Sequence, residues 1–71
     1  MSTDLKTSWA EVLGWPATQA VTQIKSDRPD VAIEVIPTGT MVAPGYNAKR
    51  VRVFFDAANS LGPVASIPVV G

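Results

Sequence analysis

Apolar positions follow helical spacing in the first half of the chain. Four of them recur at i, i+3, i+4 and i+7, which is the pattern of one buried face of an amphipathic helix. They are Ala17, Ala20, Val21 and Ile24. Pro16 suits a first turn, where a missing N–H costs nothing, and Pro29 stops the segment because the residue before a proline avoids helical angles. The pattern predicts a helix over about 16–27.

Later stretches alternate as strands do. The first is "VAIEVI" at 31–36, which Pro37 ends, and the second is "RVRVFFD" at 50–56. In the second, Arg50, Arg52 and Phe54 share one face, and Val51, Val53 and Phe55 share the other. A short closing strand is expected in "VASIPVVG" at 64–71, where Pro68 indicates an edge position.

The order of these elements indicates an α+β fold. The connection between the first two strands is long enough for parallel pairing. We therefore expect one helix packed on a small mixed sheet, in a single domain over residues 1–71. Before the helix, residues 1–8 form a polar lead-in, and Ser8 with Glu11 matches a capping box for a single turn that Gly14 ends.

Composition excludes several classes of protein. The chain has neither Cys nor His, so it lacks a thiolate and the commonest general base and metal ligand. Its six carboxylates are scattered, and we expect no enzyme, no cofactor and no metal site. The formal net charge is zero, which gives no electrostatic case for nucleic acid or an anionic membrane. No signal peptide is visible, so a cytoplasmic protein and a secreted one after leader removal both remain open.

The segment at 38–47 is a long loop for a small domain, and such loops are usually functional or disordered. It carries a run of apolar residues, "MVAP" at 41–44, unlike a disordered linker. Arg50 and Arg52 lie just after it and point to one face of their strand. If that face lies under the loop, each guanidinium can donate charge-assisted hydrogen bonds to loop carbonyls, worth about 1.5–3 kcal/mol each. The alternative is a solvated strand face with two ordinary surface arginines.

Several short sequence motifs occur in the order and at the spacing found in one known family. They are "KTSWAEVLG" at 6–14, "DRPD" at 27–30, "VIPTGTMV" at 35–42, "RVRVFFD" at 50–56 and the terminal "PVVG". On these motifs the chain resembles the potato type I serine-protease inhibitors, which include barley chymotrypsin inhibitor and eglin. The resemblance covers nearly the whole chain.

This resemblance implies a function for the loop. Residues 39–47 would enter the cleft of a serine endopeptidase as a substrate does, with the reactive bond at about Pro44–Gly45. Arg50, Arg52 and the carboxylate of Gly71 would brace the loop from below, and we expect a monomer. The residues expected to contact the protease are Thr40, Met41, Val42, Ala43, Pro44, Gly45 and Tyr46.

The centre of the loop departs from the family pattern. Members usually carry Thr at the position of Ala43, a longer side chain at Pro44, and Asp or Glu at Gly45, whose oxygens accept hydrogen bonds from the bracing arginines. Ala43 and Gly45 accept nothing through their side chains, and Pro44 has no N–H. Three possibilities follow: an inhibitor of enzymes that accept small apolar residues, an inhibitor with Ala43 in the specificity pocket, or a non-inhibitory scaffold that acts as an interaction module.

Overall fold

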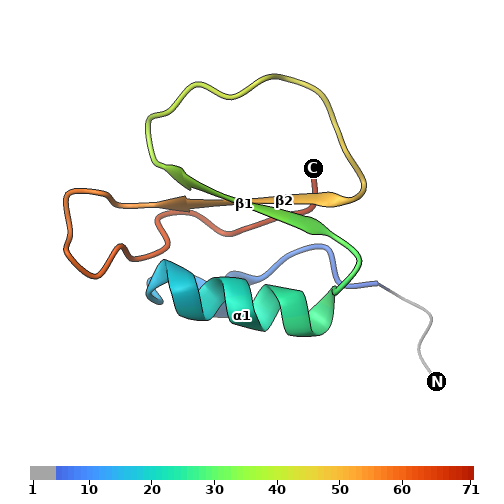
Figure 1. Cartoon of the computed structure of the whole chain (residues 1–71), viewed down its shortest axis with the longest axis horizontal. Coiled ribbons are helices and arrows are strands. Elements are labelled where there is room, and N and C mark those ends of the chain that lie inside the picture. Colours follow the sequence, from blue (N-terminus) through green and yellow to red (C-terminus); the bar gives the residue numbers. More distant parts are fainter. Residues whose placement is uncertain (1–4) are drawn as a thin grey trace.

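The computed structural model describes residues 5–71 and contains one α-helix on one face of a two-stranded sheet (Figure 1). A 3-10 turn, η1 (Ala10–Val12), precedes helix α1 (Ala17–Asp27), and strands β1 (Ala32–Pro37) and β2 (Arg50–Phe55) follow. The helix begins and ends within one residue of the prediction, and the expected α+β class is confirmed. The expected lead-in at 1–8 lies partly outside the described residues.

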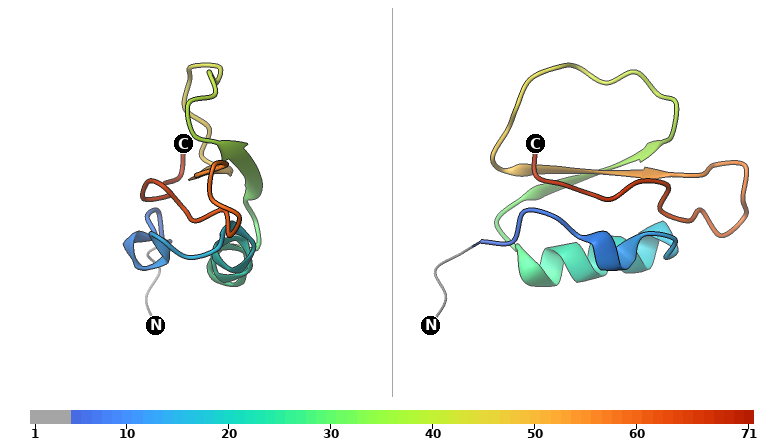
Figure 2. Two further views of the ribbon diagram at one scale, coloured as in Figure 1. Left: turned by 90° about the vertical axis from the view of Figure 1, so that its left-hand side faces the viewer. Right: turned by 180° about the vertical axis from the view of Figure 1, so that it is seen from behind.

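Strands β1 and β2 pair in parallel, with Glu34 opposite Arg52 and Val35 opposite Val53. Parallel pairing forces the chain to return from the end of β1 to the start of β2, so the connecting segment runs back along the sheet. It does so as a wide arch on the face opposite α1 (Figures 1 and 2). The topology thus leaves the helix below the sheet and the loop above it.

The closing segment differs from the predicted strand at 64–71. It meets β2 at two isolated antiparallel bridges, Phe55 to Val64 and Val51 to Val70, and is not a continuous strand. Between the bridges, Pro68 has no N–H for a ladder, and its carbonyl accepts from the N–H of Trp9 at 3.0 Å. The closing segment therefore pairs with two neighbours in turn, and Pro68 is buried instead of lying on an exposed edge.

The core lies between α1 and the sheet. Trp9 covers one end of it and is fully buried, and its indole N–H donates to Asp27 at 3.0 Å. Val51 and Val53 point into this core from β2, as the alternation predicted. The buried apolar residues are Trp9, Val12, Ala17, Ala20, Ile24, Val31, Val51, Val53 and Val64.

The predicted capping box is wrong. Trp9 takes the N-cap position of η1, and its side chain makes no capping hydrogen bond among the described residues. Ser8 instead forms a bridge with Val69 of the closing segment, and Glu11 pairs with Lys6 at 2.9 Å. Tertiary pairing of the chain ends therefore overrides the local capping pattern. Gly14 does follow the turn at a φ of 85°, as expected for a glycine that ends a turn.

An ion cluster joins the end of the helix to the starts of both strands. Arg28, whose side chain is 5% exposed, donates from Nε and Nη2 to the two oxygens of Asp30 at 2.9 and 3.0 Å. Lys49 donates to the same carboxylate at 2.7 Å. The hydrogen bonds from Arg28 are the main reason that the pKa of Asp30 lies well below its usual range, and the hydrogen bond from Lys49 is the next largest cause.

This cluster predicts a pH-dependent contribution to stability. Because folding lowers the pKa of Asp30, its stabilisation is present above the unfolded pKa, about 3.9, and is lost as the pH falls below it. Asp30→Asn should therefore lower the free energy of unfolding at pH 7, and the difference from the parent protein should shrink between about pH 5 and pH 2. Urea unfolding at a series of pH values measures this difference. Asp56→Asn, a carboxylate change outside the cluster, is the control, and a pH-independent difference for Asp30→Asn would contradict the assignment.

Candidate functional site

The arch between β1 and β2 is the most exposed part of the described chain that carries apolar side chains. Met41 is 96% exposed and Tyr46 is 76% exposed, and Ala43, Pro44 and Gly45 between them are exposed too. Exposed apolar residues of this kind mark surfaces that bind a partner. All seven residues predicted to contact a protease lie on this arch.

The crest of the arch has no main-chain hydrogen bonds of its own. Within residues 5–71, main-chain pairing stops with the N–H of Thr40, which donates to Pro37 at 3.2 Å, and resumes with that of Asn47, which donates to the oxygen of Gly71 at 2.9 Å. Residues 41–46 lie between these two anchor points. Their shape must therefore come from side chains.

Arg52 supplies the first of these contacts. Its Nη2 donates to the carbonyl of Ala43 at 3.1 Å, and its Nε donates to Glu34 Oε1 at 3.1 Å. Glu34 is its register partner on β1, so the carboxylate orients the guanidinium from the neighbouring strand. The Arg52 side chain is only 16% exposed, whereas that of Glu34 is 48% exposed, so water reaches these contacts from the side of the acceptors.

Arg50 supplies the second contact. Its Nη2 donates to the carbonyl of Gly45 at 2.7 Å and also to the main-chain oxygen of Gly71. The N–H of Gly71 donates back to the carbonyl of Arg50 at 2.8 Å, so the last residue of the chain is fixed beneath the loop. Of the three residues expected to brace the loop, Arg50 and Gly71 thus meet beneath it, and Arg52 reaches it separately at Ala43. Among the described residues, Nε of Arg50 is a buried donor that has no hydrogen-bond partner.

The two arginines hold alternate carbonyls. The carbonyls of Ala43 and Gly45 both face the sheet, because each accepts a hydrogen bond from an arginine of β2. The carbonyl of Pro44 lies between them, and no donor in residues 5–71 bonds to it. Bracing therefore uses main-chain oxygens and needs no acceptor side chain at positions 43 and 45, where the sequence offers none.

Gly45 bends the chain directly after Pro44. Its φ is 115°, a value that side chains other than glycine rarely adopt, whereas no described non-glycine residue has a positive φ. A Cβ at this position would meet no atom within 4 Å, so backbone conformation alone accounts for a glycine here. The residue that departs most from the family pattern thus takes a backbone shape that the usual Asp or Glu would adopt only with strain.

Two supporting residues were not found from the sequence. Glu34 was placed on a strand, but its role depends on the register that sets it beside Arg52. Asn47 closes the loop through its Oδ1, which accepts from the N–H of Lys49 at 2.9 Å. An Asn side chain that accepts from the N–H two residues later is a known turn pattern, so the role of Asn47 could have been predicted from the sequence.

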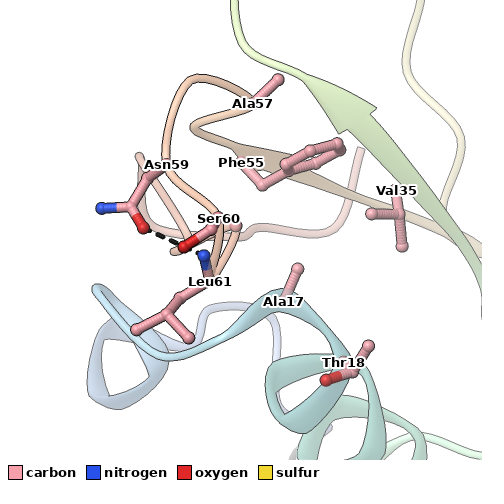
Figure 3. A pocket seen from close by; sticks show the side chains of 9 residues that line it. Ala17, Thr18, Val35, Phe55, Ala57, Asn59, Ser60 and Leu61 are labelled. Atoms are coloured by element: carbon pink, nitrogen blue, oxygen red, sulfur yellow. Dashed lines mark hydrogen bonds between the residues drawn. The ribbon is translucent and has the colours of Figure 1, made fainter.

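A hollow lies where the ends of both strands meet the start of α1, beside the turn at 56–62 (Figure 3). Its volume is about 430 Å³, and the side chains of Phe55 and Val35 face it from the two strands. No lining residue is charged, and the Asn59 carboxamide accepts from the N–H of Leu61 at 3.0 Å. It holds no set of groups that could do chemistry, and within residues 5–71 no cluster of acidic side chains could hold a metal ion.

Comparison with known proteins identifies the family. Residues 1–71 match the sequence profile of the Potato inhibitor I family. The chain is 44% identical over 66 residues to Subtilisin inhibitor 1 of Phaseolus angularis, which covers 93% of this chain and 72% of the relative. It is 40% identical over 62 residues to Subtilisin-chymotrypsin inhibitor CI-1C of Hordeum vulgare, covering 87% of this chain and 80% of the relative.

A solved structure gives the same result. The crystal structure of Bitter Gourd Trypsin Inhibitor matches all of both chains with a TM-score of 0.87 at 27% identity. The resemblance based on short sequence motifs is therefore confirmed. The protein belongs to a family of protease inhibitors and not to a class of enzymes. This chain belongs to the Potato inhibitor I family.

Proposed function

We propose that this protein inhibits serine endopeptidases by presenting residues 39–47 to their active-site cleft, with Pro44–Gly45 as the reactive bond. Relatives at 40–44% identity are named as inhibitors of subtilisin and chymotrypsin, which supports enzymes of these two kinds as partners. One observation carries the proposal for this chain. Arg52 and Arg50 hold the carbonyls on the two sides of Pro44, at 3.1 and 2.7 Å.

The same hydrogen bonds favour Pro44–Gly45 over Ala43–Pro44 as the reactive bond. A serine protease attacks a carbonyl whose oxygen enters its oxyanion hole, so this oxygen must be available to the enzyme. The carbonyl oxygen of Ala43 is already bonded to Arg52 on the sheet side. Attack at Ala43 would have to break that contact, whereas attack at Pro44 leaves both arginine contacts in place.

Bracing explains how a cleavable loop can inhibit. A flexible peptide loses conformational entropy when a protease orders it, but a loop held in shape before binding loses less and binds more tightly. After cleavage, Arg52 would still hold Ala43 and Arg50 would still hold Gly45. The new amine therefore remains near the acyl carbon, and its high effective concentration lets religation compete with hydrolysis.

A non-inhibitory scaffold of the same fold is the second candidate. It is favoured by the bend at Gly45, whose φ of 115° departs from the extended shape of a bound substrate, and by the Nε of Arg50, which has no partner in the part of the chain that the structure describes. In this alternative the loop is a surface for some other partner. The two candidates differ in what a protease does to the loop.

Inhibition and cleavage can be measured together. Incubation with subtilisin, chymotrypsin and elastase should give residual enzyme activity that falls with inhibitor concentration, while the chain stays largely uncut for hours. Slow cleavage should yield fragments 1–44 and 45–71, detected by mass spectrometry. Rapid cutting at any loop bond without loss of enzyme activity would support the scaffold instead, and a cut after Ala43 would refute the assigned bond.

Removal of the arginines should convert the inhibitor towards a substrate. Each charge-assisted hydrogen bond contributes about 1.5–3 kcal/mol, so Arg52→Ala and Arg50→Ala should each weaken inhibition about 10- to 150-fold and speed cleavage of the loop. Lys25→Ala is a matched control because it removes a cation–carbonyl hydrogen bond, to Val31 at 2.8 Å, away from the loop. Inhibition constants, cleavage rates and urea unfolding should be measured for all three. If the double arginine variant folds and inhibits like the parent protein, the arginines do not brace the loop.

A further inference from the structure

We propose that Pro44 directs this inhibitor to serine endopeptidases that cleave after proline, in preference to those with a deep specificity pocket. This inference rests on the proposed function and concerns the class of enzyme that the same loop binds. It depends on which side chain the loop presents, on what that side chain can fill, and on the chemistry of its neighbours.

The anchoring pattern makes Pro44 the residue that an enzyme must accommodate. Its neighbours are tied to the sheet through their carbonyls, and its own carbonyl is free of donors in the described part of the chain. Pro44 is exposed, and the bend at Gly45 follows it at once. The proline ring therefore stands between the two braced carbonyls, at a position where backbone and side chain are both available to a cleft.

The proline ring cannot fill a deep pocket. It ends at the backbone nitrogen and is shorter than Met, Leu or Phe, and each methylene-sized group left out of an apolar pocket weakens binding about fourfold. Proline also has no N–H. An enzyme whose main chain accepts a hydrogen bond from that amide would bury an unpaired carbonyl, which weakens binding by about 5- to 150-fold. Both losses vanish only in a pocket built for a proline ring.

The neighbouring residues agree with such a pocket. Ala43 carries only a methyl group and Gly45 has no side chain, so neither neighbour covers the exposed proline ring. Pro44 also restricts Ala43 to extended angles, which matches the shape that a protease requires of a substrate. Residues 39–48 carry no charged side chain, so the loop offers nothing to a pocket that selects Lys, Arg or Glu.

The test compares the parent protein with Pro44→Met and Pro44→Ala. The three proteins are assayed against chymotrypsin, subtilisin and a serine endopeptidase that cleaves protein substrates after proline. The parent should inhibit the post-proline enzyme at least about 100-fold more tightly than chymotrypsin. Pro44→Met should reverse this order, and Pro44→Ala should lose affinity for the post-proline enzyme without gaining the affinity of Pro44→Met for chymotrypsin. Because Pro44 is exposed, urea unfolding should change little and serves as the control for folding.

The outcomes separate this inference from the proposed function. If the parent inhibits chymotrypsin or subtilisin as tightly as Pro44→Met does, the preference for proline is refuted while the inhibitory loop stands. If only Pro44→Met inhibits any enzyme, the loop is correctly braced but the parent has no post-proline target. If neither protein inhibits any of the three enzymes and both are cut quickly, the proposed function itself fails.

Discussion

The shape of the loop between β1 and β2 depends on two guanidinium groups beneath it. Residues 41–46 have no main-chain pairing in the described structure, and the contacts that hold their carbonyls come from Arg50 and Arg52. Ordering the backbone of a single residue costs about 1–2 kcal/mol, so an unbraced crest of this length would remain mobile. Charge-assisted hydrogen bonds to main-chain oxygens are strong enough to offset a good part of that cost.

The parallel sheet places these arginines where they can act. A parallel pair requires the chain to travel back along the full length of the strands, about 20 Å for six residues, and this return path lies over the sheet. Because successive side chains of strand β2 point to opposite faces of the sheet, this strand contributes both to the core and to the support of the loop. Val51 and Val53 bury into the core against α1, while Arg50 and Arg52 face the loop. The core therefore fixes the backbone from which the loop is held. The loop itself arches over the face of the sheet opposite α1 (Figure 2).

Because the arginines bind main-chain oxygens, the support of the loop does not depend on the side chains that would contact a protease. The carbonyls of Ala43 and Gly45 are present whatever side chains these positions carry, so the loop can change its contact residues and keep its support. That separation accounts for a chain that retains the scaffold of its family while it carries Ala, Pro and Gly at the centre of the loop. The cost falls on Arg50, whose Nε is buried and has no acceptor within residues 5–71.

The sequence alone determined those features that arise from local periodicity. The apolar repeat of residues 17–24 defined the helix, alternation defined both strands and the face of each arginine, and the prolines and glycines marked where elements stop. Local pattern failed where a distant segment competes: Ser8 pairs with Val69 instead of capping η1, and the burial of Pro68 interrupts the closing strand. Tertiary structure alone decided that Arg52 meets Glu34 and that Gly45 turns to a positive φ. It also gave the atoms of the brace that the family resemblance implied, with Arg52 on the carbonyl of Ala43 and Arg50 on the oxygen of Gly71. These features depend on strand register and on the path of the returning chain, which no stretch of neighbouring residues encodes.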